Sequence, residues 1–240
     1  MLLKKNIKPK LIAFIPARGG SKRFPKKNIA KFLNKPLISY PIKEALKSKI
    51  FSDVIVSTDN KEIKKIASKF GAITVKRSKK SASDKAHELE ACREYLTALK
   101  RQKISLPDYF CVVYPTAVLV KSKDFKSSFK LFNEDSNIDV VMGVSNFNYH
   151  PHKALYINKK GYLTPAFKKE YNKRSQTYQN MVASNGSFYW HNTKSFLDKK
   201  YLGHYAKKLT GYGMVSKIST DIDYKKDLDD LNLFYRLKNK

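Results

Sequence analysis

Apolar and polar positions follow two distinct periods along the first half of the chain. Runs of apolar and β-branched residues predict buried strands over residues 10–15, 53–57, 72–75 and 109–114. Apolar residues at helical spacing predict helices over residues 37–49, 61–70 and 85–100. Asn60 is placed to cap the second of these helices, and Gly71 is placed to end it. Strands and helices in this order predict a largely parallel sheet with helices on both faces.

After about residue 145 the pattern changes to short strands and polar segments. Residues 154–157 and 162–164 flank a turn sequence and predict a β-hairpin. Residues 186–190 predict a further strand, and residues 224–237 predict a final helix. We therefore expect one domain over residues 1–240 with an insertion at about residues 145–200.

Composition narrows the class of protein without defining its function. The 240 residues carry a formal net charge of +29, and 42 of the 49 basic residues are lysines. This charge raises the alternative of a nucleic-acid-binding protein, but the lysines are scattered along the chain instead of clustered with arginine. We interpret the charge as a lysine bias that favours solubility and attracts anionic substrates, with no specific nucleic-acid partner.

Cysteine usage and hydropathy predict a reduced, cytoplasmic protein. Cys92 and Cys111 have no CxxC or metal-ligand spacing. The apolar run over residues 11–17 is short, contains Pro16 and lacks a convincing signal-peptide cleavage site. No stretch approaches the roughly 18 apolar residues that a membrane span needs, so we expect no membrane association.

The segment PARGGSKRFPKKN, residues 16–28, directly follows the first predicted strand and contains two glycines and five cations. Gly19 and Gly20 can adopt positive φ and let backbone N–H groups approach a phosphate. Arg18 can clamp phosphate oxygens with two donors, and Lys22 adds a compact charge. The segment matches neither GxGxxG nor GxxxxGK[ST], so it predicts an anion-binding loop of another kind. The alternative is a basic surface turn.

Two aspartates near the C-terminus form a candidate metal site. Asp221 and Asp223 are two positions apart, so on an extended segment they point the same way and can share one Mg²⁺. The alternative for Asp223 is the N-cap of the predicted helix over residues 224–237.

Other polar positions give weaker patterns. Asp59 follows a strand, where it either caps the next helix or approaches the site, and we favour the structural role. His150 and His152 form an HxH pattern with no further ligands, which is typical of an ordinary loop. The two cysteines are expected to pack in the core.

The longer stretch IPARGGSKRFPKKNI resembles the N-terminal signature of the cytidylyltransferases that activate sialic-acid-like sugars. The resemblance continues through KPLISYPIKEAL, VIVSTDNKEIKKIASKFGA and YPTA, and ends with STDIDYKKDL at residues 219–228. It implies a three-layer α/β/α, Rossmann-like nucleotide-diphospho-sugar transferase fold with a mostly parallel mixed sheet. It also implies transfer of CMP from CTP to the anomeric hydroxyl of the sugar, with release of pyrophosphate and with Mg²⁺ as cofactor.

The resemblance assigns roles to residues of the matched motifs. Catalysis is assigned to Arg18, Lys22, Asp221 and Asp223, with the two aspartates as metal ligands. Nucleotide binding is assigned to Ala17, Arg18, Gly19, Gly20, Ser21, Lys22, Asn28 and Arg77, and the backbone of Ala17 and Arg18 is expected to recognise cytosine. The chain departs from the family at residues 78–88, where Ser78 replaces a proline and Asp84–Glu88 replace a Ser/Thr-rich segment.

The motifs around the sugar are similar to those of the branch that acts on pseudaminic acid, a nine-carbon acidic sugar. Tyr114 stands where the N-acetylneuraminate branch usually has Gln, and Arg174 and Gln176 are further candidates for sugar binding. Asn185–Gly186 is closer to the neuraminate pattern, so N-acetylneuraminate, legionaminate or another acidic sugar is the alternative. Similar enzymes form dimers through such an insertion, which implies a homodimer. A catalytically inactive relative that serves as a binding module is a further alternative.

Overall fold

A seven-stranded sheet forms the centre of the computed structural model, which describes residues 9–198, 204, 206, 208–214 and 222–238. The strands are β1 (Leu11–Pro16), β4 (Asp53–Thr58), β5 (Ile73–Lys76), β6 (Tyr109–Val113), β7 (Val140–Asn146), β10 (Val182–Asn192) and β11 (Leu209–Gly213). Their spatial order is β11-β7-β10-β6-β1-β4-β5. β10 runs antiparallel to both of its neighbours, and the other pairs are parallel.

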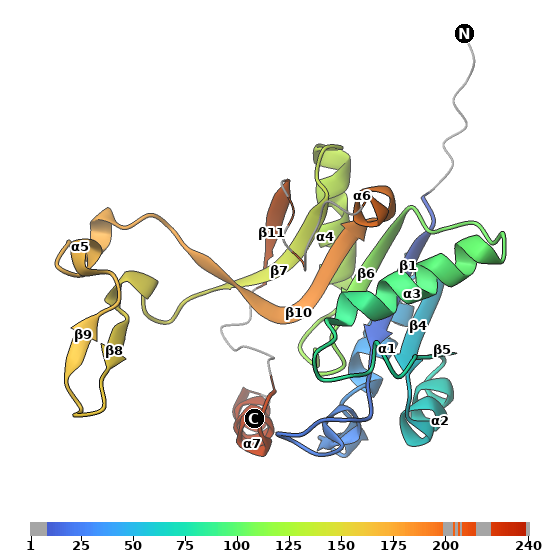
Figure 1. The fold of residues 1–240 in the computed structure, drawn as a ribbon, viewed down its shortest axis with the longest axis horizontal. Helices are drawn as coiled ribbons and strands as arrows, with labels where there is room; N and C mark the ends of the chain where they lie inside the picture. The colour runs from blue at the N-terminus through green and yellow to red at the C-terminus, as the bar shows by residue number, and fades with distance from the viewer. Residues whose placement is uncertain (1–8, 199–203, 205, 207, 215–221, 239–240) are drawn as a thin grey trace, which may run out of the picture.

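Helices cover both faces of this sheet and make a three-layer α/β/α fold (Figure 1). They are α1 (Ser39–Ser48), α2 (Lys61–Lys69), α3 (Glu88–Arg101), α4 (Ser122–Glu134) and α6 (Thr193–Leu197). A further helix, α7 (Lys225–Lys238), packs in a separate small core with Phe32, Leu37 and Val118. One core contains buried side chains of α1, α2 and α4, and the core on the other face contains those of α3 and α6. The fold expected from the sequence is confirmed.

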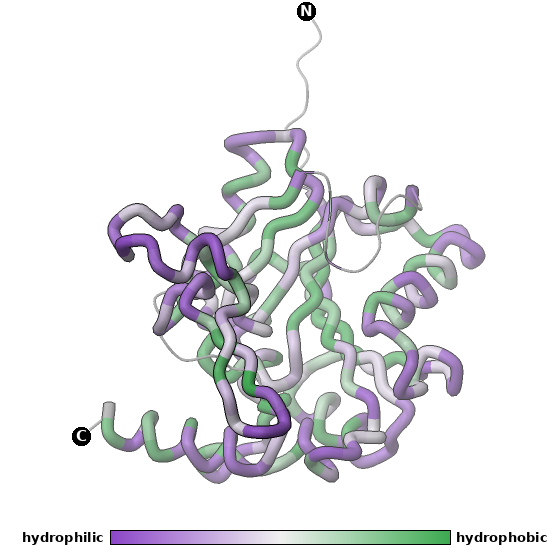
Figure 2. Tube along the Cα trace, turned by 60° about the vertical axis from the view of Figure 1, so that its left-hand side comes forward, coloured by the Kyte–Doolittle hydropathy of each residue, from purple (hydrophilic) through white to green (hydrophobic). Residues whose placement is uncertain are grey.

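Alternation along β1 explains why both faces are covered. Ala13 and Ile15 belong to the core under α1, α2 and α4, whereas Ile12 and Phe14 belong to the core under α3. All six residues of β1 are buried, as expected for a strand in a parallel sheet between two helical layers. Figure 2 shows hydrophobic residues gathered along these central strands. The same sequence run therefore serves two cores.

The structure shifts some element boundaries away from the sequence expectation. The helix expected from residue 85 begins at Glu88, because His87 is extended and forms a capping box with Glu90. The strand expected over residues 186–190 is the centre of the longer β10, which pairs with β6 and β7. Asn60 caps α2 as expected, accepting hydrogen bonds from two amides of the first turn.

A projecting arm, defined as residues 147–181, leaves the sheet between β7 and β10 (Figure 1). It contains the hairpin of β8 (Leu155–Ile157) and β9 (Leu163–Pro165), as the sequence predicts, and a short helix α5 (Lys168–Tyr171). Residues on either side of the arm return to the central sheet. The expected insertion over residues 145–200 thus includes the arm, all of β10 and α6.

Two further expectations concern the core and the membrane. Cys92 and Cys111 are both buried, free thiols; Cys92 lies in the core on the α3 face of the sheet, and Cys111 lies in the core on the opposite face. Their expected packing role is confirmed. Across the part of the chain that the structure describes, every helix is too short or too polar to cross a lipid bilayer.

Candidate active site

A pocket lies at the carboxyl ends of the central strands, where the strand order reverses. From β1 the chain passes to β4 and β5 on one side and then returns to β6 on the other side of β1. In open α/β sheets this reversal opens a crevice for ligands. The pocket encloses about 550 Å³ and is lined by Pro16, Arg18, Ser21, Lys22, Arg23, Lys27, Asn28, Asp84, Glu88, Tyr114, Pro115, Thr116 and Asp223.

The loop after β1 is held in place by hydrogen bonds to its backbone. The Gly19 amide donates to the Asp59 carboxylate at 2.7 Å, and the Asn28 side-chain amide donates to the Arg18 carbonyl at 2.9 Å. These contacts order the loop before a ligand arrives. Asp59 thus approaches the loop after β1, as the alternative interpretation expected, whereas the residue that caps α2 is Asn60.

Gly19 is required for a different reason from the one expected. Neither Gly19 nor Gly20 has a positive φ, so the expectation of left-handed backbone here is wrong. A Cβ at Gly19 would lie 2.9 Å from Cβ of Asn60, the cap of α2, whereas a Cβ at Gly20 would meet open space. The glycine at position 19 lets the loop pack directly against the start of α2.

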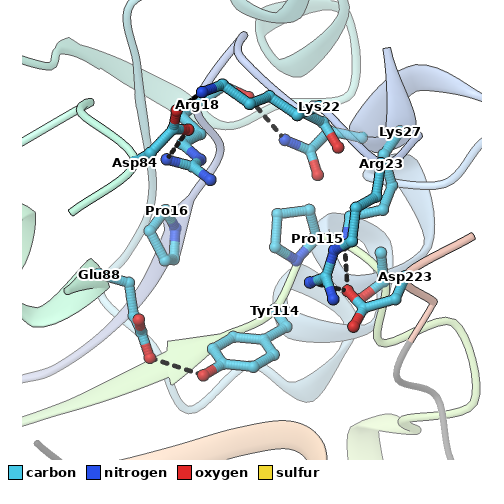
Figure 3. A pocket seen from close by; sticks show the side chains of 13 residues that line it. Pro16, Arg18, Lys22, Arg23, Lys27, Asp84, Glu88, Tyr114, Pro115 and Asp223 are labelled. Atoms are coloured by element: carbon cyan, nitrogen blue, oxygen red, sulfur yellow. Dashed lines mark hydrogen bonds and ion pairs between the residues drawn. The ribbon is translucent and has the colours of Figure 1, made fainter. Parts of the chain in front are cut away.

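Asp84 joins the two cations that the sequence assigns to phosphate binding. Arg18 lies 3.0 Å and Lys22 lies 2.6 Å from its carboxylate oxygens, and Arg18 also donates to the Ser83 carbonyl at 2.9 Å (Figure 3). The hydrogen bond from Lys22, helped by the charges of Lys22 and Arg18, lowers the pKa of Asp84. A carboxylate therefore stands where the loop cations converge. The sequence showed Asp84 only as a departure from the family pattern.

We expect Asp84→Asn to lower KM for CTP by about two- to fivefold, because a competing negative charge is removed from a half-exposed ion pair. Steady-state kinetics at varied CTP measures the change. Asp230→Asn, at an exposed acid on α7 outside the pocket, is the matched control. An increase in KM would instead mean that Asp84 positions Arg18 and Lys22 for the nucleotide.

Asp223 lies across the pocket beside two more cations. Its carboxylate is 2.8 Å from Arg23 and 3.4 Å from Lys27 (Figure 3). The amide groups of Asp223 and Tyr224 donate to the Asp227 carboxylate, so Asp227 satisfies the start of α7. The side chain of Asp223 thus faces the pocket cations instead of capping the helix. Asp221, the other expected metal ligand, lies outside the described residues.

A hydrogen-bond chain closes the opposite side of the pocket. The Tyr114 hydroxyl donates to the Glu88 carboxylate at 2.6 Å, and Nε2 of His204 lies 2.8 Å from the same oxygen atom. A carboxylate only accepts, so His204 carries its proton on Nε2, and its Nδ1 accepts from Nε2 of the buried His191 at 3.0 Å.

The protonation states of the groups in this hydrogen-bond network follow from burial and hydrogen bonding. Burial raises the pKa of Glu88, but the hydrogen bonds from His204 and Tyr114 outweigh it and lower the pKa to about 2. Burial lowers the pKa of His204 and raises that of Tyr114, and the charge of Glu88 raises the latter further. At neutral pH this hydrogen-bond network therefore consists of an anionic Glu88 between the neutral side chains of Tyr114 and His204.

The structure brings together some of the expected site residues and leaves others outside. Arg18, Ser21, Lys22, Asn28, Tyr114 and Asp223 all line the pocket. Ala17 is buried and its amide donates to the Ser57 carbonyl at 2.9 Å, while Arg77 is buried and donates from Nε to the Ser81 carbonyl at 2.9 Å. Arg174 and Gln176 lie exposed on the projecting arm.

His150 and His152 also belong to the arm. Nδ1 of His150 accepts from the amide of His152, and the two rings contact Tyr178. Within the described residues they are not part of a group of metal-ligand side chains. The ordinary-loop interpretation stays a prediction.

The three-layer fold, with a cation-rich pocket at the strand reversal, defines a class of α/β proteins that bind anionic ligands such as nucleotides. The chain belongs to the cytidylyltransferase family, whose profile matches residues 12–237. Members of this family are nucleotidyltransferases. This confirms the family indicated by the sequence motifs.

Individual relatives match nearly the whole chain. A pseudaminic acid cytidylyltransferase of Campylobacter jejuni is 31% identical over 232 residues, which cover 96% of this chain and 98% of the relative. An N-acylneuraminate cytidylyltransferase of Escherichia coli is 29% identical over 98% of this chain, but only 54% of that relative is covered.

Solved structures support the fold independently of close sequence similarity. A CMP:2-keto-3-deoxy-manno-octonic acid synthetase complexed with CTP superposes with a TM-score of 0.70 at 13% identity, covering 95% of this chain and 99% of that one. A 4-diphosphocytidyl-2C-methyl-D-erythritol synthase from Anaerococcus prevotii gives a TM-score of 0.61 at 13% identity, covering 96% and 100%. At these identities the likeness concerns the fold alone.

Proposed function

We propose that this chain transfers CMP from CTP to the anomeric hydroxyl of pseudaminic acid, giving CMP-pseudaminic acid and pyrophosphate. The observation that carries the proposal is the pocket, which joins the cationic loop, Asp223 and Tyr114 at the strand reversal of a cytidylyltransferase fold. The near full-length similarity to pseudaminic acid cytidylyltransferases supports this sugar.

Positioning and charge neutralisation supply the catalysis in this proposal. The sugar oxygen forms a bond to the α-phosphorus of CTP, the bond from that phosphorus to the bridging oxygen breaks, and pyrophosphate leaves. Arg18 and Lys22 exchange Asp84 for phosphate oxygens of CTP, and Ser21 adds a hydroxyl at the same loop. No protein nucleophile is needed for such an in-line transfer.

The carboxylate of Asp223 fits a role in binding Mg²⁺. It lines the pocket and lies near Lys27, and one or two carboxylates together with substrate phosphates are the ligands that Mg²⁺ uses. In the proposal Asp223 and Asp221 hold the ion, which supplies charge neutralisation on the phosphates when bound.

The projecting arm supports a homodimer in solution. The arm exposes large apolar side chains that a second copy of the chain could cover, namely Tyr149 and, in the hairpin, Tyr156, Ile157, Tyr162 and Leu163. Arg174 and Gln176 lie on the same arm, so in the proposed dimer they contribute to the sugar site of the partner subunit. The free thiols of Cys92 and Cys111, and the need for CTP as a substrate, are consistent with action in the cytoplasm.

We expect Ile157→Asp to convert the dimer to a monomer, because it places a charge on an apolar side chain that is 72% exposed at the end of β8. Size-exclusion chromatography with light scattering measures the mass. Lys159→Asp, which introduces the same residue at a polar position of the same hairpin, is the control. A monomeric wild type, or an unchanged mass for the variant, would contradict the dimer.

The decisive test of the function is Mg²⁺-dependent pyrophosphate release from CTP with pseudaminic, legionaminic and N-acetylneuraminic acids in parallel. Release with pseudaminic acid alone supports the proposal, and release with another acid selects the alternative sugar. The absence of pyrophosphate release with all three acids would contradict the proposed activity. Binding of DNA or RNA that persists at physiological salt would instead favour the nucleic-acid alternative raised by the charge of +29.

A further inference from the structure

One side of the pocket offers hydrogen-bond acceptors to a ligand. We name this side the acceptor wall and define it as Glu88 and Tyr114, which Figure 3 shows facing the pocket between Pro16 and Pro115. The two prolines end or follow β1 and β6 and have no backbone N–H. Neither strand end therefore places an amide donor at this wall.

The side chains of the acceptor wall also have their protons committed inside the protein. Tyr114 has a single hydroxyl proton, and Glu88 accepts it at 2.6 Å. The nearby His204 directs its ring proton to the same carboxylate oxygen at 2.8 Å. A ligand thus meets oxygen atoms of Glu88 and Tyr114 that can accept but not donate.

Packing beneath the wall fixes this arrangement. The ring of Tyr189 stacks on His204 with centroids 3.6 Å apart, and His204 is hydrogen-bonded to the buried His191. His87, whose ring also lies near this group, uses Nδ1 to accept the amide proton of Leu89. The ligand atoms of His87, Glu88 and His204 lie within 4.8 Å of one another, and the hydrogen bond from His204 to Glu88 occupies one of the carboxylate oxygens.

The charged side chains in the rest of the pocket are four cations and two aspartates, Asp84 and Asp223, that pair with them. Arg18 and Lys22 extend from the loop after β1, and Arg23 and Lys27 face Asp223. Phosphates are attracted to these cations and repelled by the carboxylate of Glu88. The part of a substrate that lies against the acceptor wall is therefore a neutral group that can donate a hydrogen bond.

Resting on the proposed function, we infer that Glu88 and Tyr114 determine specificity by accepting a hydrogen bond from the substrate. Two sources have this chemistry: the exocyclic amino group of the cytosine ring, and a hydroxyl or amide N–H of the acceptor sugar. Uracil carries an oxygen where cytosine carries the amino group, so an acceptor wall at the base would reject UTP. The inference gives a role to the segment at residues 78–88 that departs from the family pattern.

The test uses the full chain and measures binding by titration calorimetry, without turnover. CTP and UTP are titrated with Mg²⁺ present, and pseudaminic acid is titrated onto protein saturated with CMP. The variants are Glu88→Gln, whose amide keeps the shape but can donate, and Tyr114→Phe, which removes only the hydroxyl. Glu134→Gln, at an exposed glutamate on α4 outside the pocket, is the control. Thermal unfolding shows that each variant is folded.

Two results support the inference and identify the source. If the cytosine amino group donates the hydrogen bond, Glu88→Gln weakens the binding of CTP and strengthens the binding of UTP. The preference for CTP over UTP then falls by about tenfold or more. If the sugar donates, the nucleotide preference is unchanged and both variants weaken sugar binding by about tenfold. A merely structural role would weaken CTP and UTP equally, which overturns the inference, as do dissociation constants unchanged within about twofold for all three ligands. Because no step requires transfer, failure of the proposed reaction would be seen separately, in the pyrophosphate assay.

Discussion

Asp223→Asn is expected to lower the turnover number by about a hundredfold or more, with little loss of stability. Removing one preorganised electrostatic contact to a reacting phosphate costs about 10²–10³ in rate. Asp223 lines the pocket, and its carboxylate is paired with the largely exposed Arg23, so the loss of this pair has a small effect on folding. The Asn side chain keeps the size of the carboxylate, removes its charge and replaces one acceptor oxygen by an NH2 donor.

Turnover measured over a Mg²⁺ titration tests this expectation. The variant should need more Mg²⁺ for half-maximal activity as well as turn over more slowly, because a proposed ligand of the ion is lost. Asp229→Asn is the control: Asp229 is also on α7 and pairs with Lys225, but it does not line the pocket. Turnover of Asp223→Asn within twofold of the wild type would remove this aspartate from the proposed metal site.

Arg18→Ala is expected to reduce kcat/KM for CTP by about a hundredfold. Its guanidinium is two-thirds buried, is held by Asp84 and the Ser83 carbonyl, and stands ready to exchange the carboxylate for a phosphate. A hydrogen bond between charged groups contributes about 1.5–3 kcal/mol, which is a factor of roughly 10 to 150 in rate. Lys22→Ala should have a smaller effect, about tenfold, because its side chain is 82% exposed and is screened by water.

The comparison of four variants separates geometry from charge. Arg18→Lys keeps the charge but cannot bind two oxygens in one plane, so its kcat/KM should lie between those of the wild type and Arg18→Ala. Lys26→Ala is the control, since Lys26 belongs to the same loop but pairs with Glu62 outside the pocket. Equal losses for Lys26→Ala and Lys22→Ala would show that general positive charge, not the loop geometry, attracts the nucleotide.

The sequence by itself determined the elements whose signals are local. The apolar run of β1, the cap at Asn60 and the turn of the β8–β9 hairpin are set by neighbouring residues, so their periodicity and turn chemistry were sufficient. The cation-rich loop after β1 could be located for the same reason, because its glycines and cations are contiguous. Family membership followed from these contiguous motifs.

Tertiary structure alone decided which charges face one another in the site. Arg23 and Asp223 are 200 positions apart, and Glu88 and His204 are 116 positions apart, so no local pattern relates them. Asp84 meets Arg18 and Lys22 because the strand order places the segment after β5 beside the loop after β1. The length of β10 was likewise decided by the pairing surface that β6 and β7 present. Short-range periodicity determines where the helices and strands form. The pairing of distant charges and the polarity of the acceptor wall depend instead on the order of the strands in the sheet.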